Sequence, residues 1–310
     1  MDYSNLNSNP SSQSIDGEIF TPNTDNPMRV RNVFLFLGLF FVLGIILTGV
    51  ITQLLQTAGG WSPDILSGRV TTNSAAADLW KVRFLAGLNQ LLVILLPASL
   101  TVLALRRQIF SSIGMHRAPD LKNVLWGIVL MIIATPLVLY TYEWNKLVPM
   151  PDWMVAVSDQ ANATIKAILQ MPSSTELIGN ITLIAIIPAF GEELLFRGLI
   201  QRQLMRRMSP WVAIVITGAL FSLFHFQMDG FVPRWLLGML LGWLYWRSGN
   251  FWVPVIAHFF NNAIQVVAQY FYAQQLTSVD LEQDVHVPAL LALLSATTVF
   301  LAMRGWEKRT

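Results

Sequence analysis

The sequence predicts an all-α protein, a polytopic membrane helix bundle of about eight transmembrane helices with its active site in the bundle core. Two observations carry this prediction. Of the 310 residues, 54% are apolar and only 12% are charged, about half the charged share of a soluble domain. Mean hydropathy is +0.52, and long apolar stretches recur from residue 33 to the end of the chain.

Composition also excludes several classes of protein. The 20 Lys and Arg residues against 18 Asp and Glu residues give a net charge of +2, so no basic face for nucleic acid is implied. Cysteine is absent, which excludes disulfides, a catalytic thiol and thiolate-bound zinc or iron–sulfur sites. The partner that composition does imply is the lipid bilayer.

The first 32 residues differ from the rest of the chain. They are polar and rich in Asn, Ser and Pro, and they lack the basic segment, apolar segment and cleavage site of a signal peptide. We therefore expect residues 1–32 to form a disordered cytoplasmic tail. Residues 33–310 then form one transmembrane domain, with a motif-bearing core at about 176–275.

The apolar stretches define the expected spans in chain order. A helix needs roughly 20 residues to cross the hydrocarbon core, and six stretches approach or meet that length. Two further stretches, 235–246 and 287–303, are short. The eight expected spans are 33–51, 84–105, 124–142, 177–201, 210–228, 235–246, 251–273 and 287–303.

The basic residues give these spans an orientation. With a cytoplasmic N-terminus, 13 of the 20 Lys and Arg residues fall in inner segments, six fall in outer segments, and Arg197 lies within a span. This bias follows the positive-inside rule. We expect a multi-pass integral membrane protein with both termini in the cytoplasm. The outer stretch 154–171 is amphipathic and is expected to lie along the membrane interface.

The fourth span carries three ionisable residues. An ionisable side chain within a span costs at least about 2.5–3.5 kcal/mol, so each one suggests a function. Glu193 and Arg197 are four residues apart and share a helix face, so they can form an ion pair; such a pair could also simply lock two helices together. Glu192 lies about 100° around the helix from Glu193. It is less well placed to pair with Arg197 and is the carboxylate without an arginine partner.

Two other spans carry histidines. His225 lies in the fifth span, and His258 and Asn262 lie four residues apart on one face of the seventh. Asn262 alone could serve only as a hydrogen-bonding contact between helices. His258 lies only about 10 Å along its helix from residue 251. Convergence with Glu192 therefore requires the helix to tilt, to start deeper, or to follow a buried Gly249–Asn250 turn.

Three motifs in these spans resemble those of a known family. They are E-E-x-x-x-R at Glu192–Arg197, F-x-x-x-H at Phe221–His225 and H-x-x-x-N at His258–Asn262. In order and spacing they are similar to the CAAX prenyl protease and bacteriocin-processing family (CPBP, or Abi) of intramembrane proteases. The resemblance covers about residues 176–275.

The resemblance implies an intramembrane endopeptidase of the CAAX protease type, which hydrolyses a peptide bond of a membrane-associated protein or peptide. It implies that Glu192 is the catalytic carboxylate and that His225 helps to hold the attacking water. His258 and Asn262 would polarise the scissile carbonyl and stabilise its oxyanion, with Glu193 and Arg197 as supporting residues. A carboxylate base and hydrogen-bond donors to an oxyanion are what peptide hydrolysis needs.

The same residues are also compatible with other functions. Intramembrane Glu, His and Arg also mark proton and ion paths in transporters, and some members of the family act as non-catalytic membrane scaffolds. The family is often classed as metalloendopeptidases, and Glu192, His225 and His258 are zinc-ligand types. Because H-E-x-x-H is absent and a zinc-bound Glu192 could not act as the base, a metal-independent mechanism is favoured slightly over zinc.

Overall fold

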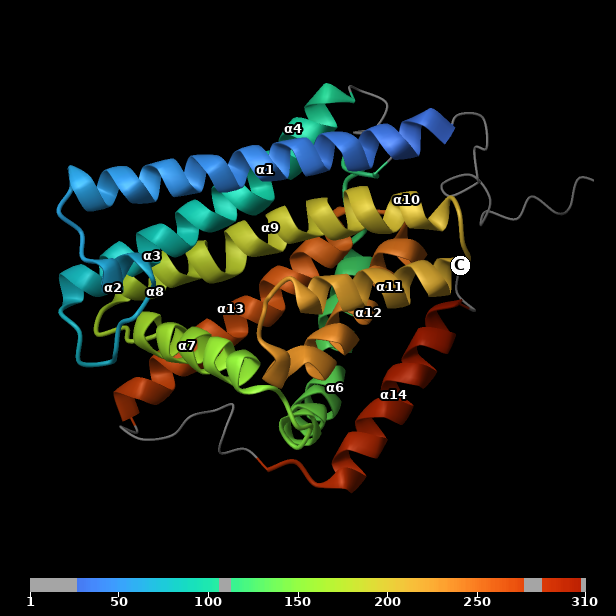
Figure 1. Ribbon diagram of the computed structural model, residues 1–310. Coiled ribbons are helices and arrows are strands. Elements are labelled where there is room, and N and C mark those ends of the chain that lie inside the picture. Colours follow the sequence, from blue (N-terminus) through green and yellow to red (C-terminus); the bar gives the residue numbers. More distant parts are fainter. Residues whose placement is uncertain (1–26, 106–112, 276–285, 308–310) are drawn as a thin grey trace, which may run out of the picture.

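The computed structural model describes residues 27–105, 113–275 and 286–307. All regular structure in these ranges is helical, as predicted. The helices pack side by side as a bundle (Figure 1). The expected tail up to residue 26 lies outside the described residues, as do several of the basic residues counted in the inner segments, Arg106 and Arg107 among them.

Two of the long helices are composite. One composite helix contains one π-helical turn and the other contains two. Such turns insert one residue into an α-helix and are frequent at functional sites. The first comprises α3 (Ala76–Asn89), η1 (Gln90–Leu95) and α4 (Leu96–Ala104). The second comprises α8 (Ser174–Asn180), η2 (Ile181–Ile186), α9 (Ile187–Glu193), η3 (Leu194–Gln201) and α10 (Arg202–Met205).

The remaining elements are single helices. The other long ones are α1 (Pro27–Thr57), α6 (Leu121–Lys146), α12 (Phe231–Ser248), α13 (Trp252–Gln275) and α14 (Ala289–Glu307). The shorter ones are α2 (Pro63–Leu66), α7 (Asp152–Ile168), α11 (Pro210–Leu223) and the 3₁₀ turn η4 (Met228–Gly230). Because α1 begins at Pro27, residues 27–32 are helical rather than part of a disordered tail.

Among the described residues, four helical segments are long and apolar enough to cross a membrane: Arg31–Thr57, Ala76–Ala104, Leu121–Lys146 and Ala289–Trp306. The predicted number of eight is therefore not confirmed. One reason is length, since the 14 residues of α11 extend only about 21 Å. Another is composition, because the motif-bearing helices contain the charged and polar residues that suggested a function.

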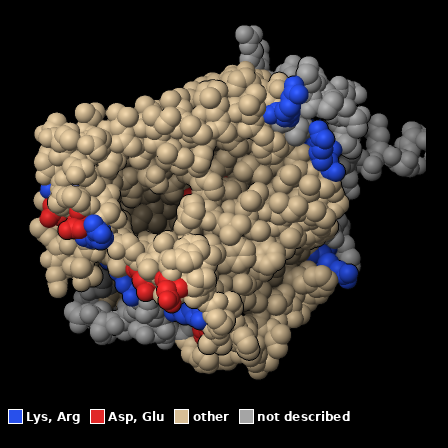
Figure 2. Space-filling model, in the orientation of Figure 1, with Lys and Arg blue, Asp and Glu red and all other residues tan. Residues whose placement is uncertain are grey.

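The surface fits a membrane protein. On the face drawn in Figure 2, the charged residues lie near the margins and most of the surface between them is uncharged. The start of α1 and the end of α14 lie at the same end (Figure 1). The side of the membrane that this end faces stays a prediction.

Pro136 interrupts the backbone hydrogen bonds of α6, and a side chain of another helix bonds to the backbone groups next to it. At Pro136 in α6, the Ser295 hydroxyl of α14 donates to the Ile133 carbonyl at 2.5 Å and accepts from the Leu137 amide at 3.3 Å. The hydroxyl thus replaces the direct hydrogen bond between residues 137 and 133, an interruption of the kind found at helix kinks. This contact attaches α14 to α6.

Two apolar clusters form the core. The first joins α1, η1, α4 and η3 through residues such as Val33, Ile94 and Phe196. The second joins α6, α12, α13 and α14 around the fully buried Trp243. The candidate site lies on the α9–η3 and α13 helices, which contribute to these two clusters.

Candidate active site

The predicted ion pair of the fourth predicted span is confirmed. Arg197 Nη1 lies 2.9 Å from Glu193 Oε1, and both side chains are 0% exposed. The Arg197 Nη2 group also donates to the Gly238 carbonyl of α12 at 2.8 Å. Two buried charges are therefore paired, as burial in a low dielectric demands.

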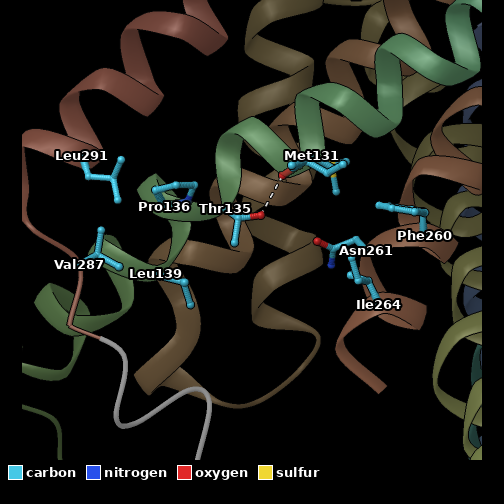
Figure 3. Close-up of a pocket in the computed structure, with 10 residues that line it drawn as sticks. Met131, Thr135, Pro136, Leu139, Phe260, Asn261, Ile264, Val287 and Leu291 are labelled. Carbon is cyan, nitrogen blue, oxygen red and sulfur yellow. Dashed lines mark hydrogen bonds between the residues drawn. The ribbon is translucent and has the colours of Figure 1, made fainter. Parts of the chain in front are cut away.

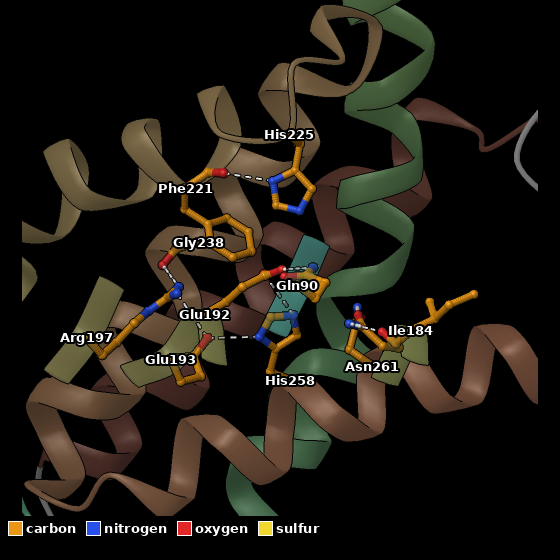
Figure 4. A network of polar contacts seen from close by, with 11 residues as sticks. Gln90, Ile184, Glu192, Glu193, Arg197, Phe221, His225, Gly238, His258 and Asn261 are labelled. Carbon is orange, nitrogen blue, oxygen red and sulfur yellow. Dashed lines mark hydrogen bonds and ion pairs between the residues drawn. The ribbon is translucent and has the colours of Figure 1, made fainter. Parts of the chain in front are cut away.

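Glu193 has a second partner from another helix. The His258 Nδ1 group of α13 lies 2.9 Å from the same Oε1 atom (Figure 4). A carboxylate can only accept, so Nδ1 carries the proton and donates it to this bond. In a neutral ring, Nε2 of His258 then has a free lone pair.

Glu192 faces that lone pair. Its Oε2 atom lies 4.0 Å from His258 Nε2, and its side chain is 8% exposed. Its other oxygen, Oε1, accepts from Gln90 Nε2 of η1 at 3.0 Å. Figure 2 shows a deep hollow between α1 and α7, over the helices that carry Glu192 and His258. Glu192 is thus the motif carboxylate that Arg197 leaves over, as predicted.

His225 follows the end of α11. With Glu192, Glu193 and His258 it forms a cluster of polar side chains. The His225 Nδ1 group lies 2.8 Å from the Phe221 carbonyl, so Nδ1 donates and Nε2 is left for the site. In Figure 4 the side chains of Glu192, His225 and His258 point into the same space. The Phe221 ring packs between the two histidines, with centroid distances of 5.0 Å to His225 and 5.8 Å to His258.

The backbone after His225 is strained. Phe226 has φ 56°, a left-handed conformation that is costly for an aromatic residue. The following turn is held by α6 and α7: the Asn145 amide donates to the Met228 carbonyl at 2.7 Å, and the Met228 amide donates to the Ser158 hydroxyl at 3.2 Å. These contacts fix the loop that presents His225.

In the described part of the chain, the hydrogen bonds of Asn262 go to residues other than Glu192, His225 and His258. Its Nδ2 group donates to the Ile184 carbonyl at 3.2 Å, and its Oδ1 atom accepts from Asn261. Ile184 lies four residues before Pro188, which has no N–H to give to that carbonyl. Asn262 therefore gives the Ile184 carbonyl a hydrogen bond that Pro188 cannot supply. The second N–H of the Asn262 side-chain amide makes no bond to this carbonyl.

The G-x-x-x-G pair of α12 does more than allow close packing. The Gly238 carbonyl accepts from Arg197, and the Gly242 carbonyl accepts from Gln201 Nε2 at 2.8 Å. A Cβ atom on Gly238 would lie 3.0 Å from the Cα of Gly218 in α11. These glycines thus let α12 reach both α11 and the helix that carries Arg197.

The depth of His258 has a clear structural basis. Gly249 and Asn250 are buried, and Gly249 adopts φ 57°. The Asn250 amide donates to the carbonyls of Arg117 and Ala118 at 3.2 and 3.1 Å. Of the three possibilities that the sequence left open, the buried Gly249–Asn250 turn is confirmed.

Sequence reasoning missed Gln90. The motifs gave no reason to select it, because it lies 102 residues before Glu192 and in a predicted span without charges. The available signal was weak: an amide side chain within an apolar stretch.

A separate pocket lies beside the cluster. It has a volume of about 460 Å³ and is walled by α6, α13 and residues near the start of α14, including Pro136, Phe260 and Val287. Its main polar side chains are Thr135 and Asn261 (Figure 3). None of Glu192, His225 and His258 lines it.

The fit of a metal to the site can be judged from its donors. Within the described parts of the chain, no three His, Cys, Asp or Glu side chains are grouped so that they could hold a metal ion. Glu193 Oε1 and His258 Nδ1 are bonded to each other, and Glu192 Oε1 is bonded to Gln90. These bonds leave Glu192 Oε2 and the Nε2 atoms of His225 and His258 for other partners, so the case against zinc rests on the spacing of the side chains.

Comparisons with known proteins bear on the same helices. Residues 174–264 match the family model described as type II CAAX prenyl endopeptidase Rce1-like. This stretch includes all three motifs. It agrees with the resemblance to the CPBP family that the motifs indicated.

One curated protein aligns with this chain over a length similar to that of the family match. The chain is 35% identical over 98 residues to the uncharacterized protein YpbD of Bacillus subtilis (strain 168). The alignment covers 29% of this chain and 46% of that protein, so it spans about half of the relative. No solved structure matches the chain.

Proposed function

We propose that this chain is an intramembrane endopeptidase of the CAAX protease type, because its residues 174–264 match the family model of Rce1-like type II CAAX prenyl endopeptidases. It hydrolyses a peptide bond of a membrane-associated protein or peptide, using a water molecule that Glu192 activates. Its class is that of the CPBP intramembrane peptidases, acting without a metal ion.

The observation that carries the proposal is the 4.0 Å separation of Glu192 Oε2 and His258 Nε2. A water molecule that donates a hydrogen bond of about 2.8 Å to each atom subtends an angle of about 90°, near its own bond angle. Both protons of such a water point at acceptors. Its lone pairs are then directed away from the two side chains, toward a substrate carbonyl.

The reaction follows from this arrangement. The water oxygen attacks the scissile carbonyl carbon while Glu192 Oε2 takes one of the water's protons. The carbonyl oxygen becomes an oxyanion. When the tetrahedral intermediate collapses, the C–N bond breaks and Glu192 returns the proton to the leaving nitrogen. The products are a carboxylate and an amine.

His258 and His225 orient the water. Each ring has its Nδ1 group fixed, His258 by Glu193 and His225 by the Phe221 carbonyl. Both therefore present Nε2 in a set direction, which is the advantage of fixed catalytic groups. Glu193 and Arg197 act through His258 as positioning residues.

The oxyanion needs N–H donors. His258 can donate only if Nε2 is also protonated, because Nδ1 is already bonded to Glu193. Asn262 has one amide N–H beyond the one that it gives to Ile184. His258 Nε2 accepts from the water in this arrangement and so has no N–H for the oxyanion; we assign the oxyanion contact to Asn262, one of the two residues to which the family resemblance gives it.

The bilayer is the expected surrounding. We propose that the motif-bearing helices α8–α13 lie within the membrane together with the four spanning segments, and that both termini are cytoplasmic. The proposal favours hydrolysis over transport because Glu192 Oε2 and His258 Nε2 are spaced so that one water molecule can bridge them.

The direct test is Glu192→Gln in purified full-length protein. The probe is a prenylated peptide ending in a CaaX sequence, with a fluorophore and a quencher on either side of the expected cleavage site. We expect cleavage to fall by about 10²- to 10⁴-fold. Asp159→Asn, the same change on the exposed side of α7, should cleave like the parent. Full cleavage by a folded Glu192→Gln variant would contradict the assignment.

A further inference from the structure

We infer that Gln90 is a positioning residue for Glu192, and that the active site therefore includes a helix outside the segment that matches the family. The matched segment begins at residue 174, whereas Gln90 belongs to the composite helix of α3, η1 and α4. This inference rests on the proposed function and adds a residue to its site.

The contact selects one carboxylate oxygen. Gln90 Nε2 donates to Glu192 Oε1 at 3.0 Å, while Oε2 of the same carboxylate faces His258 Nε2 at 4.0 Å. A carboxylate on a flexible side chain can turn about its last bond, which exchanges or redirects its oxygens. With Oε1 bonded to Gln90, Oε2 is the atom presented to the water.

The orientation of the amide is also determined. A carboxylate only accepts hydrogen bonds, so the NH₂ group of Gln90, not its carbonyl oxygen, must face Glu192. The donor is uncharged. It therefore orients Glu192 without the full charge that Arg197 contributes to Glu193, and the two adjacent carboxylates have different partners.

Glycines on both helices allow the approach. Gly87 lies one turn before Gln90, and a Cβ there would lie 2.5 Å from Leu183 Cδ2. Gly191 lies next to Glu192, and a Cβ there would touch Leu95 and Ile94 at 3.4–3.6 Å. The π-helical turn η1 begins at Gln90 itself, a frequent feature of functional sites.

The experiment compares two amide-to-methionine changes on one helix in full-length protein. Gln90→Met removes the donor but keeps the length of the side chain. Asn89→Met removes an amide from the neighbouring, exposed position, outside the cluster. With the quenched CaaX peptide we expect Gln90→Met to lower kcat by about 10- to 100-fold, the loss expected for a hydrogen bond to a charged group, with KM little changed. Asn89→Met should match the parent.

A second measurement does not require cleavage. In protein with ¹³C-labelled Glu carboxyls, the infrared difference between the parent and Glu192→Gln isolates the Glu192 band. Gln90→Met should shift this band and Asn89→Met should not. An unshifted band, or a Gln90→Met variant that retains the parental kcat, would overturn the inference.

The two proposals fail differently. If Glu192→Gln cleaves as well as the parent, the proposed function is wrong whatever Gln90 does. If Glu192→Gln is inactive but Gln90→Met is fully active, the proposed function stands and the role of Gln90 is wrong. If the parent does not cleave this peptide, the infrared band still decides whether Gln90 holds Glu192.

Discussion

A single carboxylate oxygen joins Arg197 to His258: Glu193 Oε1 lies 2.9 Å from Arg197 Nη1 and 2.9 Å from His258 Nδ1. The oxygen links an arginine of η3 to a histidine of α13, and Arg197 reaches on to the Gly238 carbonyl of α12. Three helices are thus connected by two side-chain charges and one imidazole. The ring of His258 is oriented by the same connection.

Arg197→Met should be strongly destabilising. It leaves the Glu193 charge buried without its cation, which costs about 3–5 kcal/mol when a buried pair is broken. Thermal unfolding of the purified protein in detergent measures the effect. Arg304→Met, at an exposed position in the last turn of α14, is the control and should unfold close to the parent. A parental unfolding temperature for Arg197→Met would show that the pair is not needed.

Exchanging the two charges should not restore stability. In a Glu193→Arg, Arg197→Glu double variant, the new arginine would face His258 Nδ1 and the new glutamate would face the Gly238 carbonyl. Both new contacts are unfavourable, because donors meet donors and acceptors meet acceptors. We expect the double variant to unfold no later than either single variant. Recovery in the same unfolding assay would mean that the two outer contacts matter little.

Gly238→Ala should separate α12 from its neighbours. The added Cβ would lie 3.0 Å from Gly218 Cα and 3.2 Å from the Gly218 carbonyl oxygen, so the backbone of α11 or α12 must move. We expect a loss of about 1–3 kcal/mol, typical of overpacking, together with reduced cleavage because the residue 238 carbonyl is displaced from Arg197. Gly49→Ala in α1 is the matched control, since a Cβ there meets nothing within 4 Å. The two variants are compared by thermal unfolding, and equal stability would contradict the packing argument.

The ion pair could be predicted from sequence because it follows from helix geometry alone. Glu193 and Arg197 are four residues apart on one helix, and burial leaves them few other partners. The convergence of Glu192, His225 and His258 rested on the motifs rather than on geometry. The path that allows it, a buried Gly249–Asn250 turn, could only be offered as one of three possibilities.

Contacts between distant segments were not predictable in this way. The Gln90–Glu192 bond depends on how two composite helices cross, which is set by glycines and π-helical turns in both. The position of Asn262 depends on a carbonyl that Pro188 leaves without a donor. The eight predicted spans are not all confirmed for a related reason, since a helix buried among other helices need not be apolar enough to face lipid.

Asn262→Leu distinguishes two roles for the amide. If Asn262 only satisfies the Ile184 carbonyl, the variant loses stability by about 1–3 kcal/mol but cleaves normally once folded. If it also binds the oxyanion, as we propose, kcat should fall by about 10²- to 10³-fold. The measurement is kcat on the quenched peptide alongside thermal unfolding. Gln265→Leu, an exposed amide on the same helix, is the control, and a parental kcat for Asn262→Leu would remove the oxyanion role.

Chelation should leave activity unchanged. A zinc site would need three side chains to direct free lone pairs at one point, and among the described residues no three His, Asp or Glu side chains are grouped closely enough to do so. If Glu192 were a ligand, it could not also take the water's proton, and Glu193 is already paired with Arg197. We therefore expect purified protein to keep its cleavage rate after exhaustive dialysis against a chelator, and to contain far less than one zinc per chain by elemental analysis. Adding zinc back should not raise the rate. One zinc per chain, with activity lost on its removal and regained on its return, would instead make Glu192, His225 and His258 metal ligands.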